Sequence, residues 1–359
     1  MLTFLFSESN LIAQFGNDDI PARNVPCFQN SLERMGKRYV DWECGQTPGV
    51  IDCNERLESD PGSNVVFSRN SRMPFSGTCE TCHPNGIKER VVTFVNGRTD
   101  GRDTTIYPSG CIQVIREHIE GKEHGLWTYY NDTSGLEAWQ IEFYNGEKHG
   151  RSIYFNHFPV GSDKITIKIG NIEHTIRYLI YDSDTNRIEY FNDGKLHGVR
   201  KEYYPENKIK KKVSYSNGIM HGPFIVYNRE EMVLQEMNYN MGRKDGEWKY
   251  YYEEGSLLKI ENWSNDLKVG PYKIFFINGS VQISENYDRR GRKEGWFEEY
   301  FPNERIKKRE LYRKGELIEK HVFDEFGREI ETVGGEKSSG KEDDDLPTKK
   351  KKRWWQFWK

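Results

Sequence analysis

The chain has 359 residues with 35% apolar and 30% charged residues, and its mean hydropathy is −0.87. Alanine occurs only three times, which excludes a large helical protein, and the 14% of aromatic residues exclude an intrinsically disordered chain. The net charge of −3 excludes a global field that attracts nucleic acid. No apolar run approaches the roughly 20 residues of a transmembrane helix. Many aromatics and 33 glycines with little aliphatic bulk favour thin β-structure.

The N-terminal part of the chain divides into two segments. Residues 1–14 resemble the apolar part of a secretory signal, but polar residues interrupt them, so a buried strand is an equal alternative. Residues 15–72 are rich in turn residues and are predicted to form an irregular cap over the first repeat. The six cysteines slightly favour a periplasmic or cell-envelope location over the cytoplasm. They are the candidate disulfide residues: Cys27, Cys44, Cys53, Cys79, Cys82 and Cys111.

A repeat of about 24 residues runs from residue 73 to about residue 330. Its marker is a GxxxG segment, as in GRTDG (97–101), GKEHG (121–125) and GRKDG (242–246). Two pairs of successive complete segments are separated by about twice the period. Degenerate units at GNIEH (170–174) and DLKVG (266–270) lie in these intervals, which predicts about eleven units. The closing glycines are expected to be structural, because they tolerate positive φ at tight reversals. They are Gly77, Gly101, Gly125, Gly150, Gly198, Gly222, Gly246, Gly270 and Gly295.

Inside a unit, aromatic residues recur two and five residues after the closing glycine, at positions called +2 and +5 below. Two short aromatic or β-branched runs separated by an Asn-Gly-type turn predict one β-hairpin per unit. The predicted fold is therefore all-β, an extended single-layer antiparallel sheet of about eleven stacked hairpins in a solenoid-like array. The +2 and +5 aromatics are candidates either for binding a partner or for packing one unit on the next. They are Trp127, Tyr130, Phe224, Tyr227, Trp248, Tyr251, Tyr272, Phe275, Phe297 and Tyr300.

The unit GKxHGxWxxYYxxG, followed by a second strand, resembles the MORN-type repeat. It is more closely similar to the bacterial MORN-variant family of YwqK-like proteins, which are often labelled as antitoxins. The resemblance covers about 255 of the 359 residues. It implies a scaffold that binds a protein partner rather than one defined activity, and the family label implies neutralisation of that partner.

The segment Cys79-Glu80-Thr81-Cys82-His83 satisfies the CxxCH pattern of c-type haem attachment. Counted from Gly77, however, Cys79 and Cys82 occupy the +2 and +5 positions, so the segment also fits an ordinary hairpin strand. Haem attachment, a disulfide and packed free thiols all stay open as interpretations. Because a single sheet offers no enclosing pocket, no cofactor is expected.

Two other patterns suggest metal ligands and are given a simpler interpretation. His124, His149, His197 and His221 each precede a closing glycine, but Asp or Glu fills this position in sister units, which is typical of a polar turn residue. Residues 182–186 begin like an EF-hand loop, lack its glycine and final glutamate, and fall where a hairpin turn is expected. The many carboxylates are interpreted as solvated strand surfaces. We find no catalytic motif and expect no metal, no small-molecule substrate and no enzymatic activity.

The C-terminal part consists of a polar, acidic linker over residues 331–348, predicted to be disordered, and a basic-aromatic tail over residues 349–359. The tail suits an anionic membrane surface or a pocket on another protein, whereas nucleic acid is disfavoured and folding back onto the sheet is the alternative. We predict a non-enzymatic, protein-binding scaffold, with a tail-anchored envelope scaffold as the second interpretation. The candidate tail residues are Lys349, Lys350, Lys351, Lys352, Arg353, Trp354, Trp355, Phe357 and Trp358.

Overall fold

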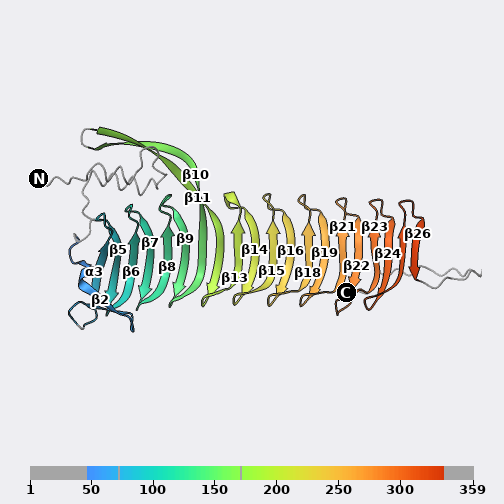
Figure 1. Cartoon of the computed structure of the whole chain (residues 1–359), viewed down its shortest axis with the longest axis horizontal. Helices are drawn as coiled ribbons and strands as arrows, with labels where there is room; N and C mark the ends of the chain where they lie inside the picture. The colour runs from blue at the N-terminus through green and yellow to red at the C-terminus, as the bar shows by residue number, and fades with distance from the viewer. Residues whose placement is uncertain (1–46, 72, 170–171, 335–359) are drawn as a thin grey trace, which may run out of the picture. The chain divides into compact units, whose positions relative to one another are not determined.

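The computed structural model describes residues 47–71, 73–169 and 172–334. Residues up to Lys268, together with Ile277–Gly279, belong to one compact unit, and Val269–Phe276 with the residues from Ser280 on form the other. Each unit is a single-layer, open sheet of hairpins in which successive array strands pair antiparallel (Figure 1). The predicted all-β, single-layer fold is therefore confirmed. The segment predicted over residues 1–14 lies outside the described residues.

The array strands of the first unit are β4 (Gly77–Cys82), β5 (Lys88–Val95), β6 (Arg98–Ile106), β7 (Ile112–Ile119), β8 (Lys122–Tyr130), β9 (Glu137–Tyr144), β10 (Glu147–Ile169), β11 (Ile172–Asn192), β12 (Lys195–Leu196), β13 (Gly198–Tyr203), β14 (Ile209–Ser216), β15 (Ile219–Tyr227), β16 (Val233–Asn240), β17 (Arg243–Lys244), β18 (Gly246–Tyr251), β19 (Leu257–Ser264) and β20 (Leu267–Lys268). A 3-10 turn, η1 (Pro205–Asn207), lies between β13 and β14. The second unit contains β21 (Gly270–Phe275), β22 (Val281–Tyr287), β23 (Gly295–Tyr300), β24 (Ile306–Arg313), β25 (Glu316–Phe323) and β26 (Glu329–Gly334).

A small cap precedes the array and consists of β1 (Ile51–Asp52), α3 (Cys53–Arg56), β2 (Leu57–Asp60) and β3 (Val65–Ser68). The side chain of Asp52 caps α3 by accepting hydrogen bonds from the amides of Asn54 and Glu55 at 2.7 and 3.0 Å. β1 pairs parallel with β4, so it covers part of the outer edge of the first array strand. Cap and first hairpin share one hydrophobic core, formed by Leu57, Cys79, Val92 and Phe94.

Gly97 is required where the cap touches the first array turn. A Cβ at this position would lie 2.4 Å from Val65 Cγ1 and 2.6 Å from the carbonyl oxygen of Val66. The Val66 amide also donates a hydrogen bond of 2.8 Å to the Gly97 carbonyl. Any side chain at position 97 would therefore separate the cap from the array.

The first glycine of a GxxxG segment usually forms a two-residue hairpin turn, although Gly291 lies in a longer turn in which its amide donates to the carbonyl of Asp288 at 3.0 Å. Asn145 and Gly146 both have positive φ, 53° and 92°, as a type I′ turn demands. The Gly146 amide donates to the carbonyl of Glu123, the third residue of the preceding GxxxG segment, at 2.9 Å. The equivalent bond recurs along each unit at 2.7–2.8 Å, from the amides of Gly121, Gly218, Gly242 and Gly315.

The closing glycine occupies a β-bulge within the following strand. Between β5 and β6, Phe94 faces Thr99 but Val92 faces Asp103, so two residues of β5 span four residues of β6. Gly101 lies in this bulge with a φ of 82°, which a residue with a side chain adopts only under strain. The GxxxG segment thus combines a turn and a bulge in five residues.

One long hairpin replaces two of the predicted units. β10 and β11 pair continuously from Gly150 opposite Phe191 to Ile169 opposite Ile172, and the outer part of the hairpin projects beyond its neighbours (Figure 1). His174, which takes the closing position of GNIEH, lies within β11 opposite Ile167, much as Gly150 lies within β10. β11 then continues to Asn192 without the expected hairpin turn, because this segment alternates apolar and polar residues without a closing glycine.

The core of each unit is a ladder of aromatic side chains on one face of the sheet, the ladder face. The ring centroid of Trp248 lies 5.3 Å from that of Tyr239 and 5.7 Å from that of Trp263. Its indole N–H donates to the carbonyl of Asn238 at 3.0 Å, and only 3% of the residue is exposed. In the second unit Phe297 takes the equivalent position, with 4% exposed.

Lysines from the GxxxG segments cover this ladder. Lys244 Nζ lies 4.7 Å from the ring centroid of Trp248 and 4.3 Å from that of Trp263. Lys293 Nζ lies 4.8 Å from the ring centroid of Phe297 in the second unit. A single-layer sheet has no second layer to cover its rings, so the long lysine stems and their charges take this role.

We expect Trp248→Ala to lower the free energy of unfolding by about 3–5 kcal/mol, because it removes a buried aromatic from the ladder. Urea unfolding followed by far-UV circular dichroism measures the change. Glu247→Ala is the matched control, because Glu247 is exposed on the opposite face in an ion pair of 2.7 Å with Lys249. Such exposed pairs contribute less than about 1 kcal/mol. Equal effects of the two substitutions would contradict a ladder-based core.

Candidate interaction surface

The face opposite the ladder face, here called the open face, carries positions +1, +3 and +5, because side chains alternate along a strand. Its +1 residues include exposed apolar side chains. Val199 and Trp296 are each 37% exposed, and Leu126 is exposed as well. Repeated exposed apolar groups of this kind are typical of a surface that contacts another molecule.

Tyrosines at +5 hold carboxylates in place on the open face. The Tyr251 hydroxyl donates to Glu236 Oε2 at 3.0 Å, and the Tyr300 hydroxyl donates to Glu298 Oε2 at 2.6 Å. Burial, followed by the hydrogen bond to Glu298, raises the pKa of Tyr300 to about 12. These hydroxyls therefore stay protonated and orient the neighbouring carboxylates.

The two aromatic positions consequently differ in their availability to a partner. Trp248 and Phe297 are buried in the ladder and are not accessible, so their burial agrees with the packing interpretation. The +2 aromatics on the ladder face are Trp127, Phe224, Trp248, Tyr272 and Phe297, and the +5 aromatics on the open face are Tyr130, Tyr227, Tyr251, Phe275 and Tyr300.

A charged residue takes the +2 position in two units, as Asp103 and as Arg200. Asp103 is fully buried on the ladder face, where Arg90 Nε lies 2.9 Å and Arg116 Nη1 3.7 Å from its carboxylate. Glu261 is likewise buried, and Lys259 Nζ lies 3.1 Å from its carboxylate. The prediction that the carboxylates are solvated is wrong at these positions, because both carboxylates are buried in the thin core beside basic side chains that neutralise them.

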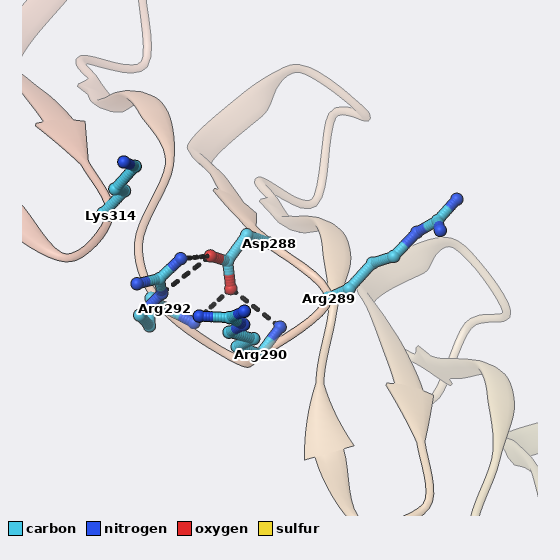
Figure 2. A pocket seen from close by; sticks show the side chains of 5 residues that line it. All are labelled: Asp288, Arg289, Arg290, Arg292 and Lys314. Carbon is cyan, nitrogen blue, oxygen red and sulfur yellow. Dashed lines mark hydrogen bonds and ion pairs between the residues drawn. The ribbon is translucent and has the colours of Figure 1, made fainter.

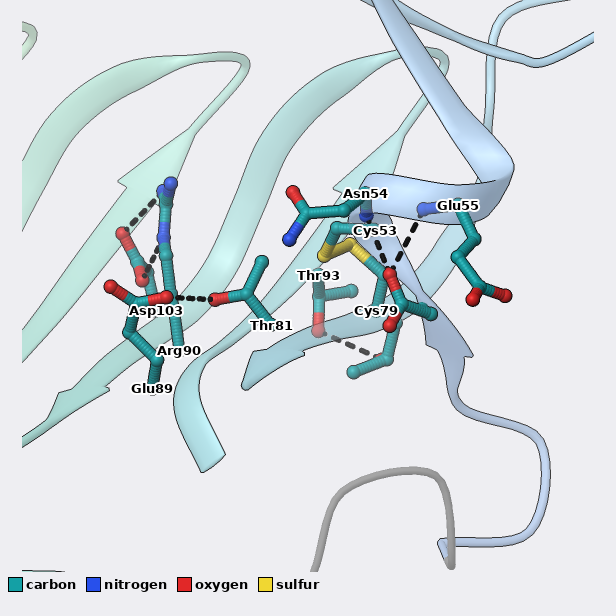
Figure 3. Close-up of a disulfide and its surroundings, with 11 residues drawn as sticks. Cys53, Asn54, Glu55, Cys79, Thr81, Glu89, Arg90, Thr93 and Asp103 are labelled. Atoms are coloured by element: carbon teal, nitrogen blue, oxygen red, sulfur yellow. Dashed lines mark hydrogen bonds and ion pairs between the residues drawn. A yellow bond between two sulfur atoms is a disulfide. The ribbon is translucent and has the colours of Figure 1, made fainter. Parts of the chain in front are cut away.

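The cysteines of the CxxCH segment form disulfides. Cys79 is bonded to Cys53 of α3, which links the cap to the first hairpin (Figure 3). Cys82 and Cys111 are disulfide-bonded as well. These sulfur atoms are therefore not free to form the thioether bonds of a c-type haem.

His83 fills a position that tyrosine occupies in sister units. Its Nε2–H donates to the carbonyl of Ile106 at 2.7 Å, which joins one hairpin turn to the next hairpin. Tyr107 makes the same connection to the carbonyl of Tyr130 at 3.1 Å, and Tyr204 makes it to that of Tyr227. The His83 ring therefore has a structural role, the same one that Tyr107 and Tyr204 have in their units.

In three units the polar residue before the closing glycine accepts a hydrogen bond from the next turn. Asp100 Oδ2 accepts from the amide of Glu120 at 3.1 Å, and Glu294 Oε2 accepts from the amide of Lys314 at 2.7 Å. His221 Nδ1 accepts at this position from the amide of Met241 at 3.4 Å. Within residues 47–334, leaving out the undescribed positions, no group of three or more His, Cys, Asp or Glu side chains could hold a metal.

The EF-hand-like run, residues 182–186, lies inside β11 and not at a hairpin turn, so the predicted turn is wrong here. β10 and β11 instead stay paired from Gly150 opposite Phe191 to Ile169 opposite Ile172. Asp184 instead accepts a hydrogen bond of 2.7 Å from the amide of Glu206 in the adjacent η1 turn.

The connection between β22 and β23 forms a basic turn (Figure 2). The Asp288 carboxylate accepts from the amides of Arg290 and Arg292 at 2.8 and 2.9 Å and pairs with the Arg292 guanidinium at 2.6 Å. The bonds from the Arg292 amide and side chain hold the pKa of Asp288 at about 2. Arg289, Arg290 and Lys314 also line the hollow beside it, with Arg289 pointing away from Lys314 (Figure 2). The turn is electropositive because its one carboxylate is already engaged.

Among the described residues, no helix is long and apolar enough to cross a membrane. The candidate tail residues and the acidic linker beyond residue 334 lie outside the described residues, as do Cys27 and Cys44.

Comparison with protein families finds the MORN repeat variant at residues 196–217 and 244–265. The two matches begin 48 residues apart, which is two periods of the 24-residue repeat. These two segments of the array are therefore similar to the MORN repeat variant. A comparison with curated proteins finds no match.

Solved structures with some similarity include the Photorhabdus luminescens Tc holotoxin pore. That match has 12% identity and a TM-score of 0.15, and it covers 81% of this chain and 16% of the other. The TcdB2–TccC3–Cdc42 complex matches with 10% identity and a TM-score of 0.14, over 75% of this chain and 16% of that one. TM-scores this low relate neither fold nor function.

We expect His83→Tyr to leave stability unchanged, because tyrosine makes the same bond in sister units. His83→Leu removes the bond to the Ile106 carbonyl and is expected to lower the free energy of unfolding by about 1 kcal/mol. Chemical unfolding of the oxidised protein measures both. Equal destabilisation by the two substitutions would show that the imidazole itself is required.

Proposed function

We propose that the protein is a non-enzymatic scaffold that binds a protein partner through the open face of its hairpin repeats. The observation that carries this proposal is the difference in exposure between the two faces of the sheet. The aromatics of the ladder face are buried with their lysine covers, whereas the open face presents exposed apolar +1 residues such as Val199 and Trp296. MORN repeats generally mediate protein or membrane binding, which agrees with this role.

The finer proposal is that binding neutralises or organises the partner. It rests on the resemblance of the repeat unit to the YwqK-like proteins labelled as antitoxins. We also propose an oxidising location, such as the periplasm or cell envelope. The disulfide between Cys53 and Cys79 supports it, because such bonds persist outside the reducing cytoplasm.

The open face is tested by capturing partners from native extract with the wild-type protein and with Val199→Glu/Trp296→Glu. We expect the double substitution to abolish capture of a partner that the wild type retains, because it places charges in an apolar contact. Met232→Glu is the matched control, since Met232 is also 37% exposed but lies in a turn. Equal loss with the control substitution, or no loss with the double substitution, would contradict binding through the open face.

The second candidate function is a membrane-associated scaffold held by residues 349–359. Its support is sequence alone, five consecutive basic residues followed by three tryptophans and a phenylalanine among the last six residues. Lysines favour anionic headgroups and tryptophans favour the membrane boundary.

Flotation with phosphatidylglycerol vesicles tests this second function. The full chain is expected to float, whereas a chain shortened to residue 348 stays at the bottom of the gradient. High salt should reduce flotation, because headgroup attraction is screened. Equal flotation of the full and shortened chains would dismiss the role of the tail.

A further inference from the structure

Two lysines lie directly opposite each other on the open face of the first unit. Lys201 of β13 is the register partner of Lys212 of β14. In an antiparallel pair this arrangement places the Cβ atoms about 4.5–5.5 Å apart, and like charges at that spacing repel each other. Neither lysine forms an ion pair with a carboxylate of the described residues. Lys212 Nζ lies 5.2 Å from the ring centroid of Tyr227, but no carboxylate of the described residues neutralises the pair.

On the opposite face of the same two strands, basic side chains pair with a carboxylate. Lys211 Nζ lies 3.0 Å from Glu202 Oε2, and Arg200 Nη2 lies 2.7 Å from Glu202 Oε1. Burial acts to raise the pKa of Glu202, but the hydrogen bonds and charges of Lys211 and Arg200 outweigh it, so this pKa lies below its usual value. Neighbouring residues of one strand thus differ: Lys211 pairs with a carboxylate, whereas Lys212 lies over the ring of Tyr227.

The surroundings of the lysine pair are apolar. Ile188 of β11 is the register partner of Lys201, and Ile225 of β15 is that of Lys212. The next residue in this cross-strand row is Glu236, opposite Ile225, which already accepts the hydroxyl hydrogen bond of Tyr251. Two strand spacings, roughly 10 Å, separate the backbone of Glu236 from that of Lys212. A carboxylate that neutralises the lysine pair must therefore come from outside this row.

We propose that Lys201 and Lys212 bind an acidic segment of a protein partner, with one Asp or Glu carboxylate between the two ammonium groups and apolar residues over Ile188 and Ile225. This inference rests on the proposed function and names the chemistry of the partner. Two lysines are too few for a lipid-binding cluster, which needs about 4–8 basic residues. Nucleic acid is disfavoured by the overall charge of −3.

The experiment compares Lys212→Glu with Lys211→Glu in the full chain. The two substitutions change charge equally at adjacent positions of β14 but act on opposite faces. Lys212→Glu places a carboxylate opposite Lys201, so it should raise Tm while weakening binding of a fluorescein-labelled Glu–Val repeat peptide by about tenfold or more. Lys211→Glu places a second carboxylate beside Glu202, so it should lower Tm and leave peptide affinity unchanged. A Gln–Val peptide is expected to bind neither variant nor the wild type.

Several outcomes would overturn the inference. It fails if Lys212→Glu leaves peptide affinity or Tm unchanged, or if the Gln–Val peptide binds as well as the Glu–Val peptide. Loss of binding to phosphatidylglycerol vesicles on Lys212→Glu, with peptide binding unaffected, would assign the pair to lipid instead. If the wild type captures its partner through the open face but Lys212→Glu captures it equally, this inference fails while the proposed function stands.

Discussion

The hydrogen bond from the first glycine of one GxxxG segment to the third residue of the preceding segment is the contact on which the repeat depends. It connects turns that are about one 24-residue period apart, as between Gly146 and Glu123. The turn needs positive φ at two consecutive residues, which an Asn-Gly pair adopts readily. The same glycine that permits the turn therefore also supplies the amide that donates this hydrogen bond. Once successive turns are connected, the strands between them are held in one register. The +2 rings then stack and the +3 residues form a row across the open face.

A single layer also limits what the core can contain. The ladder has only one neighbour on each side and no second sheet above it, so its rings are covered by lysines such as Lys244 and Lys293. Some units lack the aromatic, and in one of them a paired charge takes its place, because Asp103 lies between Arg90 and Arg116. A buried carboxylate is tolerable there because its partners come from the flanking strands. The low hydropathy of the chain follows from this construction.

Departures from the repeat are the places where individual function is expected. The repeated positions are occupied by what each hairpin needs to pack on the next, so they carry little information about a partner. The lysine pair of β13 and β14, the basic turn after Tyr287 and the projecting β10–β11 hairpin do not serve that packing. Of these, the lysine pair is the one whose arrangement is unfavourable for the described chain alone, which is why it points to a ligand.

The sequence alone determined the period, the hairpins, the positive-φ glycines and the two aromatic positions, because turn chemistry and strand alternation act over a few residues. It did not reveal that β10 and β11 run through a whole period, since a missing glycine only permits a longer strand. It left the CxxCH segment with three interpretations, and only the tertiary structure paired Cys79 with Cys53 and His83 with the carbonyl of Ile106. It did not place Lys201 opposite Lys212 either. Those neighbours depend on cross-strand register, which the bulges at the closing glycines shift by whole residues, and that register forms only when the strands pair.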